Sequence, residues 1–116
     1  MSQHPVVWFE IRGDKQEKLQ GFYGELFGWS LNRDNPTGYG VLAPPGGKGI
    51  AGGVGERGGV FSHRITFYVE TEDLEGSLER AIALGGKLVT PPTPVAGIRV
   101  ALFQDPEGNV VGLSTP

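Results

Sequence analysis

The chain has 116 residues, enough for one domain with a hydrophobic core and too few for two of ordinary size. A net charge of -3 with 10 scattered Lys and Arg residues gives no basic surface for nucleic acid, and no apolar run approaches the roughly 20 residues that span a membrane. The absence of cysteine excludes disulfides and thiolate chemistry, and the first residues lack a secretory signal, so we expect a cytoplasmic protein without nucleic-acid or membrane partners.

The first half of the chain is predicted to form a strand, a helix and three further strands. Residues 6–11 alternate apolar and polar side chains as a half-buried strand does. Residues 14–27 have helical periodicity, with Asp14 available as an N-cap and Gly28 as a stop. The apolar side chains of this helix are expected in the core: Phe22, Tyr23, Leu26 and Phe27. The further strands are expected at residues 29–32, 39–42 and 49–54.

The second half repeats this order. Residues 64–70 alternate apolar and polar side chains in the same way as the first strand, at an offset of 58 residues. An amphipathic helix is expected after them, at 72–84. The last strands are expected at 87–89, 98–103 and 110–114, separated by a proline loop at 90–94 and a turn at 105–109. Neither half, alone, is long enough to bury a sheet face, which predicts an α+β protein of two tandem βαβββ modules packed together.

Strand alternation divides the side chains of the two leading strands into two sets. The helices are expected to cover one set: Val7, Phe9, Ile11, Ile65, Phe67 and Val69. The other set faces the opposite side: Trp8, Glu10, Thr66, Tyr68 and Glu70. This second set is too polar for a closed core and too aromatic for plain surface, so it indicates a cleft.

Three segments give the chain a family resemblance. They are FYGELFGW at 22–29, VETEDLEGSLERAIALGGK at 69–87 and FQDPEGNVVGL at 103–113. With the duplicated module, the chain resembles the vicinal oxygen chelate superfamily of glyoxalases, bleomycin resistance proteins and extradiol dioxygenases. The resemblance implies one domain over residues 1–116, with modules at about 5–58 and 60–116. It also implies a curved mixed sheet around a cleft, helices on the outer face, and a homodimer.

The superfamily's metalloenzymes hold a divalent ion through four inward side chains, one from the first and one from the last strand of each module. Carried over by position, the resemblance places Trp8, Gly52, Thr66 and Gly112 there. None is a strong ligand, so we expect no metal and no cofactor. A carboxylate site rebuilt from Glu10 and Glu70 stays open as an alternative. His63 is expected to make a capping or surface hydrogen bond.

Two function classes remain. In the first, the chain binds a small apolar or aromatic molecule without chemistry, in a sequestration or carrier role like that of bleomycin resistance proteins. The expected lining is Trp8, Glu10, Gly52, Thr66, Tyr68, Val100, Leu102, Gly112 and Ser114. In the second, a glyoxalase-like lyase or isomerase uses Glu10 as a catalytic base, with its pKa raised by apolar surroundings, with or without a carboxylate-bound metal. A pocketless partner protein, with Trp8 and Tyr68 filling the cleft, is a third reading.

Overall fold

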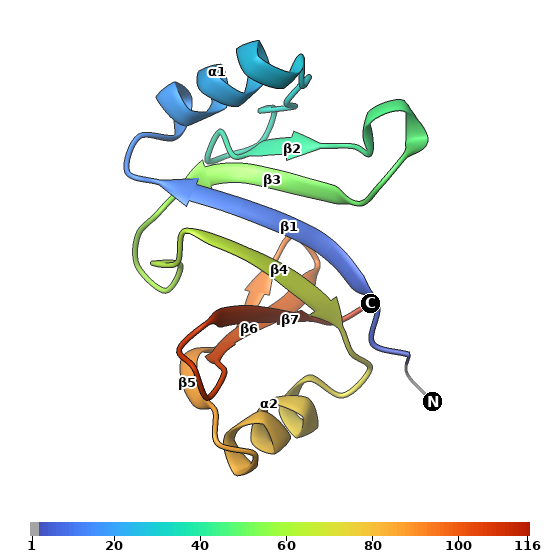
Figure 1. Cartoon of the computed structure of the whole chain (residues 1–116), viewed down its shortest axis with the longest axis vertical. Coiled ribbons are helices and arrows are strands. Elements are labelled where there is room, and N and C mark those ends of the chain that lie inside the picture. The colour runs from blue at the N-terminus through green and yellow to red at the C-terminus, as the bar shows by residue number, and fades with distance from the viewer. Residues whose placement is uncertain (1–2) are drawn as a thin grey trace. The chain divides into compact units, whose positions relative to one another are not determined.

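The computed structural model describes residues 3–116, which form seven strands and two α-helices, as expected for an α+β protein (Figure 1). They divide into two compact units that follow the duplication in the sequence. One unit is residues 8–65 and the other combines residues 3–7 with residues 66–116. The first residues join the second unit because the carbonyl of Pro5 accepts a hydrogen bond from the Glu70 N–H at 2.9 Å.

The unit of residues 8–65 has a mixed sheet with one helix. Its elements are β1 (Val6–Gly13), α1 (Gln16–Phe27), β2 (Gly40–Leu42), the 3-10 turn η1 (Pro45–Gly47) and β3 (Ala51–Glu56). β3 lies between its neighbours, parallel to β1 and antiparallel to β2. The strand predicted at 29–32 is reduced to a single bridge between Asn32 and Val41.

The second unit has the same plan and one strand more. Its elements are β4 (Ile65–Glu70), α2 (Leu74–Ala83), β5 (Lys87–Val95), β6 (Ile98–Gln104) and β7 (Val110–Ser114). β4 is parallel to β7, and β7, β6 and β5 follow in antiparallel order. In both halves, therefore, the first strand pairs in parallel with the last, which gives the repeat a structural counterpart. The predicted proline loop at 90–94 is instead part of β5, where register shifts accommodate the prolines.

α2 packs as the sequence predicts. The Asp73 side chain caps it by accepting a hydrogen bond from the Gly76 N–H at 3.0 Å. Leu74 and Leu78 form the core of this unit, and the other members of that cluster are Ala101, Leu113, Val69 and Phe103. Because α2 lies over β5, β6 and β7, it does not cover the start of β4. The expectation that Ile65 and Phe67 lie under a helix is therefore wrong, and both are exposed.

α1 is anchored differently from the prediction. The structure buries one of its residues, Gln20, whose Nε2 donates to the carbonyls of Gly38 and Val54 at 3.0 and 2.8 Å. Asp14 does not cap the helix; the N–H of Gln16 instead donates to the Glu56 carboxylate at 3.2 Å. Within the described residues, no helix is long and apolar enough to cross a membrane.

The aromatic residues of α1 are only partly covered. Tyr23 stacks on Trp29 with 5.8 Å between ring centroids, and Trp29 contacts Phe9 of β1 at 5.7 Å. The predicted core residues Phe22, Leu26 and Phe27 are 58%, 57% and 57% exposed. Their assignment to the core is wrong. The helix packs through Gln20 and the Tyr23–Trp29 pair, which leaves Phe22 and Leu26 on its open outer side, while Phe27 contacts Tyr23 and Trp29 and stays exposed.

Candidate functional site

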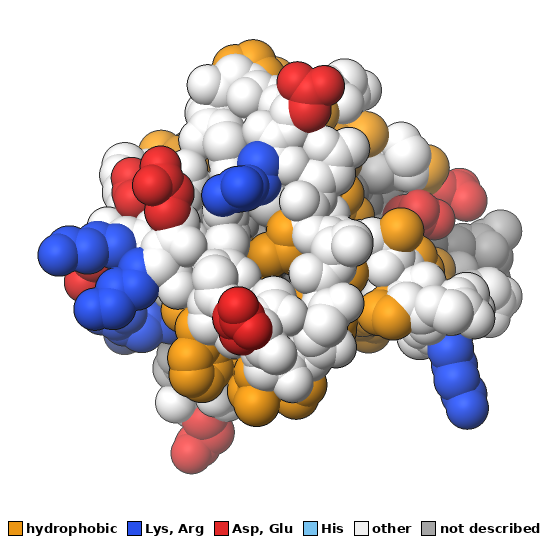
Figure 2. Space-filling view, turned by 90° about the horizontal axis from the view of Figure 1, so that it is seen from above, with side chains coloured by type: hydrophobic (Ala, Val, Ile, Leu, Met, Phe, Trp, Pro, Cys, Tyr) orange, Lys and Arg blue, Asp and Glu red, His pale blue; other side chains and the backbone are white. Residues whose placement is uncertain are grey.

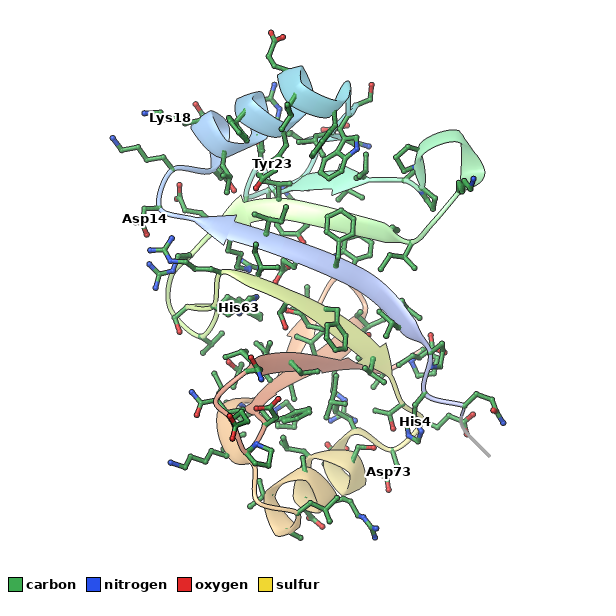
Figure 3. The ribbon with its side chains drawn as sticks, in the orientation of Figure 1. His4, Asp14, Lys18, Tyr23, His63 and Asp73 are labelled. Atoms are coloured by element: carbon green, nitrogen blue, oxygen red, sulfur yellow. The ribbon has the colours of Figure 1, made fainter. Side chains whose placement is uncertain are left out.

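A group of hydrogen-bonded side chains surrounds the carboxylate of Glu10 within residues 8–65. Because side chains alternate along a strand, β1 places Trp8, Glu10 and Arg12 on one face. Tyr39 comes from the segment before β2. His63, which Figure 3 labels, comes from the segment that leads into β4. We call these five residues the Glu10 cluster.

Both oxygens of the Glu10 carboxylate, which is buried, accept hydrogen bonds. Arg12 binds it in bidentate fashion, with Nε donating to Oε1 at 2.9 Å and Nη2 to Oε2 at 3.2 Å. The Tyr39 hydroxyl donates to Oε2 at 2.6 Å, and His63 Nε2 lies 2.5 Å from Oε1. The indole N–H of Trp8 donates to the Tyr39 hydroxyl at 3.1 Å. The carboxylate thus fixes three side chains directly and Trp8 through Tyr39.

These donors decide the acidity of Glu10. Burial by itself raises the pKa of a carboxyl group, but the hydrogen bonds from His63, Arg12 and Tyr39 and the charge of Arg12 outweigh it and lower the pKa of Glu10 to about 2. The expectation of a raised pKa is therefore wrong. Burial and the adjacent Glu10 carboxylate raise the pKa of Tyr39 far above its ordinary value, so that Tyr39 remains a protonated donor.

Arg12 supplies the positive charge of the cluster. Its Nη1 donates to the carbonyl of Glu56 at 2.7 Å, which ties β1 to the end of β3. The guanidinium carbon lies 4.6 Å from the ring centroid of Phe61 and 5.5 Å from that of Tyr39, within the range of cation–π contacts. The guanidinium of Arg12 is therefore held by two aromatic rings and by the Glu10 carboxylate.

His63 lies inside the cluster, and the expected capping or surface role is wrong. Its side chain is 2% exposed, and its Nε2 is directed at the Glu10 carboxylate. With Glu10 ionised, the network assigns the Nε2 proton to this hydrogen bond. Nδ1 is buried and has no hydrogen-bond partner among the described residues.

Two glycines of β3 lie under the Tyr39 ring. A Cβ atom on Gly53 would lie 1.9 Å from the Tyr39 hydroxyl oxygen, and one on Gly55 would lie 2.4 Å from a ring carbon. The register of β1 and β3 pairs Glu10 with Gly53. Gly52 faces the opposite side, where a Cβ atom would lie 2.1 Å from the Phe9 ring. Placing Gly52 on the face of Glu10 is therefore wrong by one residue.

The second unit shows the same arrangement of a tyrosine over a glycine. The register of β4 and β7 pairs Tyr68 with Gly112, as β1 and β3 pair Glu10 with Gly53. A Cβ atom on Gly112 would lie 2.3 Å from the Tyr68 ring. Thr66 donates its hydroxyl to the carbonyl of Val110 at 2.5 Å. All residues predicted as lining from this half are buried: Thr66, Tyr68, Val100, Leu102, Gly112 and Ser114.

The residues at the superfamily's ligand positions do not fit a metal ion. An indole at Trp8 offers no lone pair in its plane, and its N–H is already donated to Tyr39. The Thr66 hydroxyl is engaged by a backbone carbonyl. At the two last-strand positions, Gly53 and Gly112 carry no side chain, and tyrosine rings occupy the space that a ligand side chain would need.

The surface of the described residues has open depressions, two of which are defined by their lining residues. One lies at the β5–β6 turn and is lined by residues 94–99 and Thr115. The other lies at the start of α1 and is lined by residues 15–18 and Glu56. None of the residues predicted to line a site belongs to either depression.

Sequence reasoning missed three partners of Glu10. Arg12 is two residues away on the same strand face, so strand alternation was a signal that could have identified it. Tyr39 and His63 are 29 and 53 residues from Glu10, and no local pattern links them to it. Their contacts depend on the folded path of the chain.

Comparisons with known proteins agree on the type of fold. A family model described as a glyoxalase-like domain matches residues 8–114. A glyoxalase/bleomycin resistance protein/dioxygenase superfamily member from Vibrio splendidus is similar at 17% identity and a TM-score of 0.64, covering 98% of this chain and 100% of its own. No curated protein sequence matches the chain.

Two further solved structures are similar at low identity. A methylmalonyl-CoA epimerase from Streptomyces coelicolor, in complex with 2-nitronate-propionyl-CoA, has 16% identity and a TM-score of 0.66, with 98% of each chain covered. A protein described as an NAD-dependent benzaldehyde dehydrogenase from Legionella pneumophila has 12% identity and a TM-score of 0.69, covering 93% of this chain and 96% of its own. At these identities the likeness establishes the fold alone.

Proposed function

The chain belongs to the glyoxalase-like domain family of the vicinal oxygen chelate superfamily, and on this premise we propose that it binds a small apolar or aromatic molecule without a metal ion. Its role in this proposal is sequestration or transport of the ligand, as in the bleomycin resistance branch, and it carries out no reaction. A complex of the similar epimerase with an acyl-CoA analogue is consistent with a fold that holds small molecules.

The observation that carries the proposal is that a tyrosine ring covers each of the two last-strand positions where the superfamily's metalloenzymes have a metal ligand. Tyr39 covers Gly53 in one half and Tyr68 covers Gly112 in the other. A metal ligand introduced at either glycine would collide with the ring above it. In both halves a tyrosine ring thus takes the place of a metal ligand, which supports binding without a metal ion. Because Tyr68 is buried, the aromatic surface left for a ligand is that of Trp8.

The acid–base properties of Glu10 argue against the enzyme alternative. A general base near neutral pH needs a pKa close to the working pH and a free lone pair directed at the substrate. Glu10 has a pKa of about 2, and its oxygens accept hydrogen bonds from Arg12, Tyr39 and His63. We therefore propose that Glu10 positions Arg12, Tyr39 and His63 and does not remove a proton from a substrate.

Trp8 is the residue that we propose to contact the ligand. Its side chain is partly exposed, and the hydrogen bond from its N–H to Tyr39 fixes the orientation of the indole ring. A ring held in one orientation loses little conformational entropy when a flat molecule stacks on it. The Glu10 cluster would then act as the support that holds this stacking surface ready.

Fluorescence tests this proposal. Trp29→Phe leaves Trp8 as the only tryptophan, and we expect 2-naphthol to quench its emission with a saturable, micromolar dissociation constant. Trp8→Ala should weaken binding, measured by calorimetry, by about tenfold or more because a stacking surface is lost. Glu79→Gln on the exposed face of α2 is the matched control and should leave binding unchanged.

Two results would contradict the proposal. The first is stoichiometric binding of nickel, zinc or manganese at micromolar affinity in the native protein, which would require ligands other than those described. The second is an unchanged affinity for 2-naphthol in Trp8→Ala. Turnover of a substrate that Glu10→Gln abolishes would restore the enzyme alternative.

The proposal also includes a homodimer, which the superfamily resemblance implies. The open side of α1 supports it, since two large apolar side chains one turn apart on that side, Phe22 and Leu26, are more than half exposed. Sedimentation velocity at several concentrations measures the oligomeric state directly.

A further inference from the structure

α1 exposes its apolar side chains and buries a polar one. Gln20 is its buried residue, whereas Phe22, Leu26 and Phe27 are each more than half exposed. α2 buries two large apolar side chains, Leu74 and Leu78, and exposes one, Ile82. Phe27 contacts the rings of Tyr23 and Trp29 and lies on their side of the helix. Phe22 and Leu26, four residues apart, share the outward side, and isolated exposed apolar residues are common, so it is their pairing on one side that indicates a surface covered by a partner.

The outward face of α1 has an ordered pattern of side chains. Residues three and four apart lie on one side of a helix, so Lys18, Gly21, Phe22 and Glu25 form a single stripe. All four are exposed. Figure 3 shows Lys18 pointing away from the strands while Tyr23 points towards them. Figure 2, seen from above in the orientation of Figure 1, shows separate acidic and basic side chains on a mainly white face with smaller hydrophobic areas among them.

We propose that two copies of this chain associate through α1, with the two helices antiparallel about a two-fold axis between Gly21 and Phe22. This names the surface of the homodimer in the proposed function, and it does not depend on ligand binding. With a rise of about 1.5 Å per residue, Lys18 and Glu25 lie at equal distances on either side of the axis. Lys18 then meets Glu25 of the partner subunit, and Phe22 meets Gly21 of the partner subunit.

The charges of the stripe favour a second copy over an unrelated partner. Lys18 and Glu25 make no ion pair within the described residues, so both are available. A two-fold interface requires a surface that is complementary to itself. Lys18 precedes the axis and Glu25 follows it at the same spacing, so the two-fold contact forms two Lys18–Glu25 ion pairs between the two copies.

The space around Gly21 fits the apolar part of the contact. A Cβ atom on Gly21 would have no heavy atom within 4 Å, so the helix surface is open at that point. Phe22 is 58% exposed and stands next to this opening. In the antiparallel arrangement each phenyl ring covers the Gly21 position of the other copy, and the absence of a side chain there lets the helices approach closely. The contact area of one short helix pair is small, so we expect a dissociation constant in the micromolar range, about 1–100 µM.

Charge reversal and charge exchange test the arrangement. Sedimentation velocity and equilibrium from about 1 µM to 1 mM should give a monomer–dimer equilibrium for the native chain. Lys18→Glu or Glu25→Lys alone places like charges opposite each other twice and should weaken the dimer about tenfold or more. The double variant Lys18→Glu/Glu25→Lys restores both pairs and should recover the native dissociation constant to within about threefold.

Further variants separate the helix contact from other causes. Phe22→Ala should weaken the dimer by about tenfold or more, because it removes the central apolar side chain. Lys87→Glu on β5 and Glu79→Lys on α2 repeat the charge changes at exposed positions of the other unit and should have no effect.

The outcomes distinguish this inference from the proposed function. A chain that remains monomeric at 1 mM refutes both the α1 contact and the homodimer. A dimer that is unaffected by Phe22→Ala and by both charge reversals refutes the α1 contact and leaves the homodimer standing. Binding of 2-naphthol is measured separately, so its failure has no bearing on α1.

Discussion

Glu10→Gln tests whether the carboxylate of the Glu10 cluster holds unit 8–65 together. The substitution keeps the size of the side chain but removes the charge that Arg12 and His63 bind. The shift in the pKa of Glu10 from its ordinary value of 4.5 to about 2 corresponds to roughly 3 kcal/mol of folding free energy. Because the pKa is lower in the folded state, this stabilisation is complete above about pH 5 and is lost as the pH falls towards 2. Glu10→Gln should therefore cost about 3 kcal/mol at pH 7 and progressively less in acid.

Urea unfolding of both proteins between pH 7 and pH 3 measures this effect. The difference in the free energy of unfolding should shrink as the pH falls, while Glu79→Gln, an exposed carboxylate on α2, should show no such difference. A difference that is the same at pH 7 and pH 3 would refute the reasoning. So would an NMR titration that gives Glu10 a pKa above 5 in the folded protein, since the base role would then be open again.

Three other substitutions test the contacts around Glu10. Arg12→Met should destabilise the protein by about 3 kcal/mol in urea and raise the pKa of Glu10 in an NMR titration, because the buried carboxylate loses its cation. Gly53→Ala should cost about 1–3 kcal/mol in the same urea assay, because its Cβ atom displaces the Tyr39 ring; a neutral result contradicts the close packing. Tyr39→Phe should cost about 1–2 kcal/mol and change the emission of Trp8, whose indole N–H loses its acceptor; unchanged emission contradicts the hydrogen bond.

The repeat was the part of the fold that the sequence predicted best. Alternation over residues 6–11 and 64–70, each followed by a helical period, is a local signal, and local signals place elements reliably. The packing of α1 could not be predicted in this way. Its Phe22 and Leu26 have the spacing of a core face, but the spacing of apolar residues is the same for a face that meets the sheet and a face that meets another chain. Only the position of Gln20 against the carbonyls of Gly38 and Val54 decides between them.

The sequence predicted which face of β1 carries the Glu10 cluster but missed the chemistry of that cluster. Strand alternation placed Trp8 and Glu10 on one face, which the hydrogen bonds of the Glu10 cluster bear out. The acidity of Glu10 was predicted in the wrong direction, because burial was the only influence that the sequence revealed. The donors that reverse it, Tyr39 and His63, reach the carboxylate across 29 and 53 residues of chain. The sequence around a buried carboxylate is the same whether or not donors reach it in the folded chain. Without donors its pKa lies above the ordinary value, and with them its pKa can lie below that value.

The glycines of the last strands show why a metal site cannot be restored here by one substitution. A histidine at Gly53 would need the space that the Tyr39 ring fills, and a ligand at Gly112 would need the space that the Tyr68 ring fills. The two rings come from different elements of their halves. Tyr68 belongs to the first strand of its half, whereas Tyr39 belongs to the segment before β2. At the position in β1 that corresponds to Tyr68 stands Glu10, which holds Tyr39 by its hydroxyl. Removing Tyr39 to admit a ligand would therefore also remove a donor from the buried carboxylate and the acceptor of the Trp8 N–H, so each half would require coupled changes before a metal ion could bind.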